Sequence, residues 1–200
     1  MFLNEIGQPH ILDAQKKYGP YDQHNGALLM TSTAFKDHQV SPTWCKRIIG
    51  SLENMRRLES VPNNIKNYTY HVIRPNEPTK VFYDETKLTV ELLPTGKNKD
   101  GIDMSMFFID NGQTRYLIVD ELSGHLDFLI KASALKEDID VVYIDELLLE
   151  EEQPINEDLY AFVQLIRPKH VYGIRTQEPL PKWLQDLCVN KDIYARVPPV

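Results

Sequence analysis

The fold depends on the pattern in residues 104–120, MSMFFIDNGQTRYLIVD. Met104–Ile109 and Arg115–Val119 are short runs rich in apolar, aromatic and β-branched residues, and such runs are typical of strands. Between them, Asp110-Asn111-Gly112 is a strong hairpin signal, because an Asn-Gly pair adopts positive φ angles at little cost. The stretch therefore predicts two antiparallel strands, and Asp120 directly follows the second strand.

Before this hairpin the sequence predicts mainly strands. Apolar or alternating runs predict them at residues 27–31, 68–73, 80–83 and 88–93. Residues 41–58 predict a helix, because Ser41-Pro42-Thr43 resembles a helix start and is followed by apolar residues at helical spacing, namely Trp44, Ile48, Ile49, Leu52 and Met55.

After the hairpin, helices and strands are predicted to alternate. Helical patterns occupy residues 124–136, 156–166 and 181–188, and strand patterns occupy residues 141–144 and 170–174. A block of strands followed by alternating helices and strands predicts a mixed α/β sandwich. We expect one largely antiparallel sheet and a more parallel second half.

The composition indicates a single globular domain spanning residues 1–200, with 42% hydrophobic and 26% charged residues and no internal repeat. Its apolar runs are too short to cross a membrane, and no secretory signal is visible, so we expect a cytoplasmic protein without membrane contact. Cys45 and Cys188 form neither a disulfide framework nor a paired metal motif. The formal charge of −7 argues against nucleic-acid binding.

Few residues form a recognisable chemical motif. The six histidines make no compact chelating set, and the sequence contains no P-loop, nucleophile elbow or dinucleotide-binding glycine motif. Asp120 follows a predicted buried strand, so its carboxylate either faces a cleft or caps the next helix. Asp37-His38 is a second candidate pair, for which a role in a loop or helix cap is the alternative.

The order of several short motifs resembles that of the metallo-β-lactamase superfamily. Ile11-Leu12-Asp13 and then residues 26–38, GALLMTSTAFKDH, are similar to the family's strand ending in Asp and its strand leading into a His-x-His-x-Asp-His loop. Further segments follow in the order of the family. Residues 90–97 (VELLPTGK) resemble the strand that leads to the third ligand histidine, and residues 105–112 resemble the hairpin after it. Residues 116–120 resemble the strand that ends in a metal-bridging Asp, and residues 141–145 and 167–175 resemble the last two strands.

The resemblance implies an αββα sandwich, but this chain departs from the family at the metal ligands. Thr33 and Phe35 stand in place of the first two histidines, Gly96 or Lys97 in place of the third, and Arg175 in place of the last. Phe offers a metal no lone pair, and a Lys or Arg cation repels it. We therefore expect no di-metal centre and no cofactor.

The alternative is one weakly bound divalent metal, zinc or manganese. Asp37, His38 and Asp120 would hold it, and the same three residues are the catalytic candidates if the chain is an enzyme. Arg175 either pairs with these acids or joins Lys97 and Ser105 in a pocket for a phosphate or carboxylate.

The N-terminal part also departs from the resemblance. Family members place two or more strands before the position of Asp13, where this chain has twelve residues. The resemblance therefore implies a trimmed N-terminal sheet. Because an exposed sheet edge favours pairing with another chain, we expect a homo-oligomer or a protein partner.

Three functions from different classes follow. We favour a degenerate metallo-β-lactamase-like pseudoenzyme that binds a partner protein or a small anionic ligand. The second hypothesis is a divergent metal-dependent hydrolase of ester or phosphodiester bonds with the same fold, although the lost ligands argue against a competent metallohydrolase. The third is an unrelated α/β assembly subunit, and only the first two hypotheses require the αββα sandwich.

Overall fold

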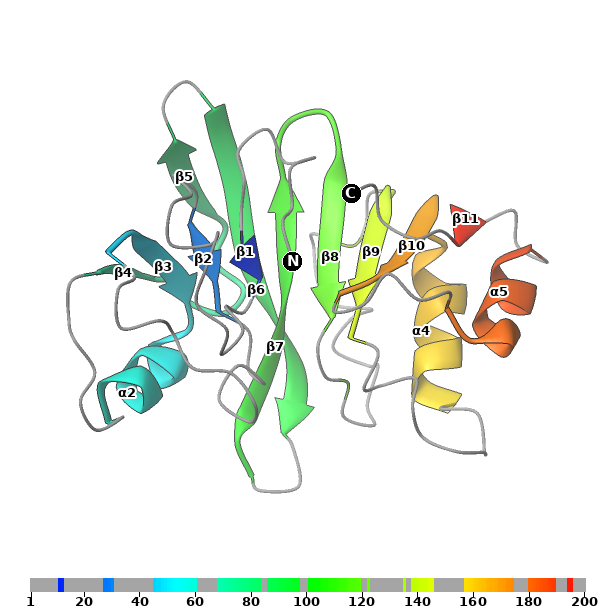
Figure 1. Ribbon diagram of the computed structural model, residues 1–200, viewed down its shortest axis with the longest axis horizontal. Coiled ribbons are helices and arrows are strands. Elements are labelled where there is room, and N and C mark those ends of the chain that lie inside the picture. The colour runs from blue at the N-terminus through cyan, green and yellow to red at the C-terminus, as the bar shows by residue number, and fades with distance from the viewer. Residues whose placement is uncertain are drawn as a thin grey trace.

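The computed structural model describes residues 11–12, 27–30, 45–60, 68–83, 86–97, 101–119, 122, 135, 138–145, 157–174, 180–189 and 194–195. The strands in this part of the chain form two sheets (Figure 1). The first sheet has four parallel strands in the order β1 (Ile11–Leu12), β2 (Leu28–Leu29), β3 (Arg47–Gly50) and β4 (Thr69–Val72). Residues 27–30 and 48–50 are all buried, as expected for a parallel sheet covered on both faces.

The second sheet is larger and mixed. Its seven described strands lie in the order β11 (Tyr194–Ala195), β10 (His170–Gly173), β9 (Val141–Ile144), β8 (Arg115–Val119), β7 (Asp103–Asp110), β6 (Thr86–Lys97) and β5 (Thr79–Tyr83). Strands β5 to β8 are antiparallel, and β8 to β11 are parallel. The predicted antiparallel and parallel parts therefore belong to one sheet, whereas the first sheet is wholly parallel.

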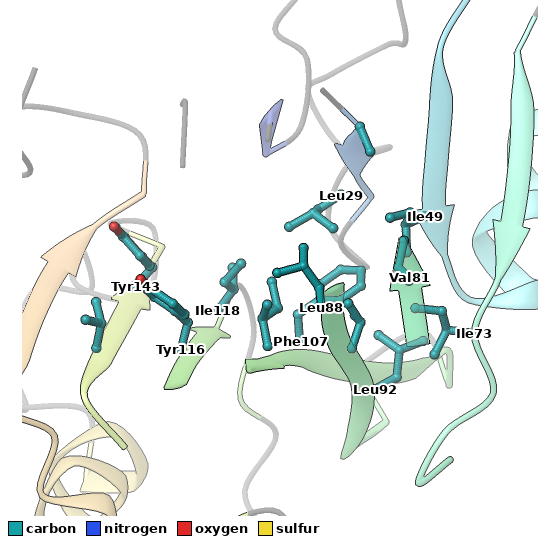
Figure 2. Packing of buried hydrophobic residues seen from close by; sticks show 14 of the residues in the cluster. Leu29, Ile49, Ile73, Val81, Leu88, Leu92, Phe107, Tyr116, Ile118 and Tyr143 are labelled. Carbon is teal, nitrogen blue, oxygen red and sulfur yellow. The ribbon is translucent and has the colours of Figure 1, made fainter. Parts of the chain in front are cut away.

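Side chains from both sheets meet in an inter-sheet core (Figure 2). Leu29 and Ile49 of the first sheet belong to the same buried cluster as Leu92, Phe107 and Ile118 of the second. Because successive side chains of a strand point to opposite faces, every second residue of the central strands faces this core. We call this side of the second sheet the inter-sheet face.

The other side of the second sheet is covered by two helices, α4 (Glu157–Ile166) and α5 (Lys182–Val189) (Figure 1). Leu117 of β8 lies in a second buried cluster with Phe162 of α4 and Leu184 of α5. Each helix presents an apolar stripe to the sheet, as surface helices usually do, although Leu165 of α4 and Val189 of α5 are exposed.

Helix α2 (Leu52–Ser60) lies against the first sheet. The Asn54 side chain donates a hydrogen bond to the Met30 carbonyl (3.1 Å), and the Tyr70 hydroxyl donates one to the Ser51 carbonyl (3.1 Å). The layers therefore follow the order helix, sheet, sheet, helix, which confirms the predicted αββα sandwich. In the described part of the chain the first sheet has four strands and the second has seven, and the trimmed N-terminal sheet stays a prediction.

The strand predictions between residues 68 and 174 are confirmed, but the helix predicted over residues 41–58 is wrong in its first part. Ile48 and Ile49 lie in β3, and the helix begins only at Leu52. Both isoleucines are fully buried, and a short, wholly buried strand cannot be distinguished from a helix by periodicity alone. Ser51 is the residue that caps the helix, since its Oγ accepts a hydrogen bond from the Asn54 N–H (3.0 Å).

The hairpin between β7 and β8 is present at the predicted turn. Gly112 has a φ of 86°, and its N–H donates to Asp110 Oδ1 (2.6 Å). Asn111 Oδ1 accepts hydrogen bonds from the N–H groups of Gln113 (2.9 Å) and Thr114 (2.8 Å). These side chains satisfy the turn's own backbone, which is why Asp and Asn favour such positions. Of the helices in the described residues, none has the length and apolar character needed to cross a membrane.

Candidate functional site

Three parallel strands of the second sheet end side by side. Val119 of β8 is level with Ile144 of β9, which is level with Gly173 of β10. The ladder continues one residue further, because the Asp145 N–H donates to the Val119 carbonyl (2.8 Å) and the Ile174 N–H donates to the Ile144 carbonyl (3.0 Å). Ligands of α/β sheets bind outside the carboxyl ends of such strands. We call this end of the sheet the carboxyl edge and treat it as the candidate site.

Asp145 is the described carboxylate at this edge. It is only 1% exposed, and Val141 and Tyr143, which precede it by four and two residues, both belong to the inter-sheet core. Alternation therefore places Asp145 on the inter-sheet face. Asp145 is not among the residues predicted from the sequence, although it follows a buried strand in the same way that Asp120 does. That shared position after a strand is the signal that could have identified it.

Ser105 approaches the same edge from β7. Phe107 and Tyr143 both lie level with Ile118, on opposite sides of β8 (Figure 2). Ser105 lies two residues from Phe107, and Asp145 lies two residues from Tyr143, both toward the carboxyl edge. Ser105 and Asp145 are therefore level with each other across the sheet, in one row of side chains on the inter-sheet face. Two strand spacings, about 10 Å, separate their backbones.

A β-bulge lies in β6 where that strand reaches the carboxyl edge. Pro94 is opposite Ser105, Gly96 is opposite Met104 and Thr95 is the extra residue. Gly96 has a φ of 101°, a conformation that favours glycine, and Thr95 is fully buried. Bulges are common beside active sites because they change the direction in which the next side chain points. This bulge occupies the segment in which the resemblance places the third ligand histidine.

Lys97 is the residue that the bulge redirects. It lies opposite Asp103, and its ammonium Nζ is 2.9 Å from Asp103 Oδ1. Asp103 precedes Ser105 by two residues, so Lys97, Asp103 and Ser105 share the inter-sheet face of the β6–β7 ribbon. The structure thus brings together two of the predicted anion-binding residues, Lys97 and Ser105, and adds Asp103, which the sequence analysis did not select.

The other predicted site residues, Asp37, His38, Asp120 and Arg175, lie outside the described residues. In the sequence, Asp120 directly follows Val119, and Arg175 directly follows Ile174.

The donor groups described at the carboxyl edge do not fit a metal centre. They are the Asp145 carboxylate and the hydroxyls of Ser105 and Thr95, with the ion pair of Lys97 and Asp103 nearby. A zinc site takes three or four nitrogen, sulfur or oxygen ligands in tetrahedral geometry. Across the described ranges, no cluster of three or more His, Cys, Asp or Glu side chains could hold a metal ion.

The fold is similar to that of several solved structures. Zinc-bound PqqB from Methylobacterium extorquens is 9% identical, with a TM-score of 0.64 over 98% of this chain and 83% of that chain. The metallo-β-lactamase fold protein YhfI from Bacillus subtilis is 10% identical, with a TM-score of 0.60 over 96% and 84% of the two chains. The metallo hydrolase Igni18 from Ignicoccus hospitalis is 12% identical, with a TM-score of 0.58 over 93% and 83%.

A scan against family models found no match, and a search of curated proteins found none. The structural likeness nevertheless shows the fold, because it extends over nearly the whole chain. The chain has the metallo-β-lactamase fold, as the order of its motifs predicts. The two functional hypotheses that share this fold are therefore the ones to compare.

Proposed function

We propose that this protein is a metallo-β-lactamase-fold pseudoenzyme that has no di-metal centre and binds a small anion, a phosphate or a carboxylate, at the carboxyl edge. The observation that carries the proposal is the position of Lys97. This cation stands in the segment where the resemblance expects a metal-binding histidine, and the bulge turns it to the same face as Ser105. An ammonium group has three donors and no lone pair, so it attracts an anion and repels a metal ion.

The proposed contacts follow from this arrangement. The Lys97 ammonium and the Ser105 hydroxyl donate hydrogen bonds to the anion from neighbouring strands. Arg175, the third predicted anion-binding residue, lies outside the described residues, and these two contacts do not depend on it. The backbones of Asp145 and Ser105 are about 10 Å apart, and because Asp145 is buried its repulsion of an anion at Ser105 is about 1.7 kcal/mol at an effective dielectric constant of about 20. This repulsion favours the end of the row away from Asp145. The anion therefore binds at the Ser105 end of the edge.

Isothermal titration calorimetry with inorganic phosphate and with acetate tests the proposal. We expect measurable binding of at least one anion by the parent protein. Lys97→Gln should weaken it by about threefold to tenfold, because one charge-assisted hydrogen bond is lost. Lys87→Gln removes an exposed charge from the same strand and should leave the affinity unchanged. Absence of binding, or equal effects of the two substitutions, would contradict the proposal.

The competing function is a metal-dependent hydrolase. It is favoured by the likeness to zinc-bound PqqB and to Igni18, which is named a metallo hydrolase. It requires that Asp37, His38 and Asp120 bind a metal strongly enough to activate water. Metal content separates the two functions, because the anion-binding proposal needs none.

A cytoplasmic location is also part of the proposal. Cys45 is an exposed free thiol and Cys188 is a buried one. Free thiols persist in a reducing compartment, whereas oxidising compartments favour disulfides.

A further inference from the structure

The bulge in β6 determines which residue faces Asp103. If β6 had no bulge and Thr95 paired with Met104, Gly96 would be opposite Asp103 and Lys97 would point to the other face of the ribbon. With the bulge, Lys97 and Asp103 are directly opposite each other. Ser105 is two residues further along β7 than Asp103, on the same face. The same feature that directs Lys97 to the proposed anion site therefore also supplies it with a carboxylate.

The Lys97–Asp103 ion pair is short but exposed. Its N–O distance is 2.9 Å, while the side chains are 64% and 77% exposed. Pairs this exposed are weak, because water screens the attraction and both side chains lose conformational freedom. An incoming anion can therefore displace the Asp103 carboxylate from Lys97 at little cost.

We propose that Asp103 is an internal competitor that sets the affinity of the anion site. This inference rests on the proposed anion-binding function and adds a specific regulator to it. When no anion is bound, the Asp103 carboxylate forms an ion pair with the Lys97 ammonium. An anion must therefore displace the Asp103 carboxylate before it can bind the Lys97 ammonium. Asp103 therefore weakens binding through Lys97, and it contributes no contact to the anion.

The prediction is that Asp103→Asn tightens the binding of inorganic phosphate. Asparagine keeps the shape of the side chain but removes its charge, so Lys97 is released for the anion. The dissociation constant should fall by about twofold to fivefold, the range expected for an exposed ion pair. Asp186→Asn is the matched control, because it removes the same charge from an exposed position on α5.

A double-mutant cycle shows whether Asp103 acts through Lys97. Phosphate affinity is measured by calorimetry for the parent, Asp103→Asn, Lys97→Gln and the double variant. We expect Asp103→Asn to tighten binding in the parent and to have no effect once Lys97 is Gln. A melting temperature for each variant identifies any effect on the ribbon's stability, which would not by itself change the affinity.

The outcomes separate this inference from the function on which it rests. If the parent binds phosphate but Asp103→Asn binds no more tightly, the competitor role is wrong and the anion-binding function stands. If Asp103→Asn and Asp186→Asn tighten binding equally, or if the gain persists beside Lys97→Gln, overall charge is the cause and the competitor role is again wrong. If neither phosphate nor acetate binds to the parent or to any variant, the proposed function itself fails.

Discussion

Asp140 connects the starts of three neighbouring strands through a single carboxylate. Its Oδ2 accepts a hydrogen bond from the Arg115 N–H (2.9 Å), and its Oδ1 accepts one from Lys169 Nζ (2.6 Å). Arg115 begins β8, Lys169 immediately precedes β10, and Asp140 itself precedes β9. Burial alone would raise the pKa of Asp140, but the hydrogen bonds from Lys169 and Arg115 outweigh it and hold the pKa below its usual value.

The sign of this shift gives a pH-dependent prediction. A carboxylate whose pKa is lowered by folding stabilises the protein above its unfolded pKa of about 3.9 and loses that contribution as the pH falls through the folded pKa. Asp140→Asn should therefore lower the free energy of unfolding by about 1–3 kcal/mol at neutral pH. The deficit should shrink as the pH approaches about 3.

Urea unfolding of the parent and of Asp140→Asn at several pH values measures this deficit. Asp186→Asn again serves as the exposed control and should cost less than about 0.5 kcal/mol. A deficit that stayed constant down to pH 3 would show that the Asp140 charge is not the stabilising feature.

At the scale of the elements, the contact between β3 and β4 depends on the absence of a side chain at Gly50. A Cβ atom added at Gly50 would overlap the Tyr70 hydroxyl oxygen and would lie 3.2 Å from the Met30 carbonyl oxygen. That hydroxyl also donates to the Ser51 carbonyl at the start of α2 (3.1 Å), so it cannot move without losing a bond between sheet and helix.

Gly50→Ala should therefore destabilise the protein by about 1–3 kcal/mol, as overpacking of a well-filled interior usually does. In a Tyr70→Phe background the hydroxyl is absent, and the same substitution should cost clearly less. Urea unfolding of the four proteins measures both costs. Equal costs in the two backgrounds would show that the Tyr70 hydroxyl is not what fills the space.

At the scale of the whole molecule, the metallo-β-lactamase fold and the residues of its carboxyl edge point to different chemistry. The sandwich brings the ends of its strands to one edge, and the described part of that edge holds the Lys97 cation, its partner Asp103 and the Asp145 carboxylate. A fold does not determine an activity, because the side chains of the site do. The expected homo-oligomer or protein partner stays a prediction that depends on the smaller first sheet.

Metal content is the prediction that belongs to this scale. We expect less than about a tenth of an equivalent of zinc, manganese or iron in protein purified without chelator or histidine tag, because too few ligands remain. Inductively coupled plasma mass spectrometry measures it, before and after incubation with added metal. PqqB, whose solved structure holds zinc, is the positive control. About one equivalent or more would instead support the hydrolase.

The sequence alone determined most of the strands, the turn between β7 and β8 and the order of the motifs. These features depend on neighbours in the chain: the short apolar run of residues 104–109, followed by a turn signal, indicates a strand, and Asn111-Gly112 indicates a turn. The order of such local features predicted a mixed α/β sandwich, and the resemblance of the motifs to the metallo-β-lactamase superfamily implied the αββα arrangement. Local pattern failed at Ile48 and Ile49, where burial on both faces of a parallel sheet removes the alternation that marks a strand.

Only the tertiary structure decided which side chains share a face. Glu91 is charged, yet it is only 3% exposed and burial raises its pKa, because β6 lies between two covered faces. Asp145 reaches the carboxyl edge because β9 lies between β8 and β10, and the bulge at Thr95 places Lys97 opposite Asp103. Strand order and register are set by contacts between residues far apart in the chain. The resemblance of short motifs therefore predicted Lys97 and Ser105 as candidates, while Asp103 and Asp145 emerged only when the sheet was assembled.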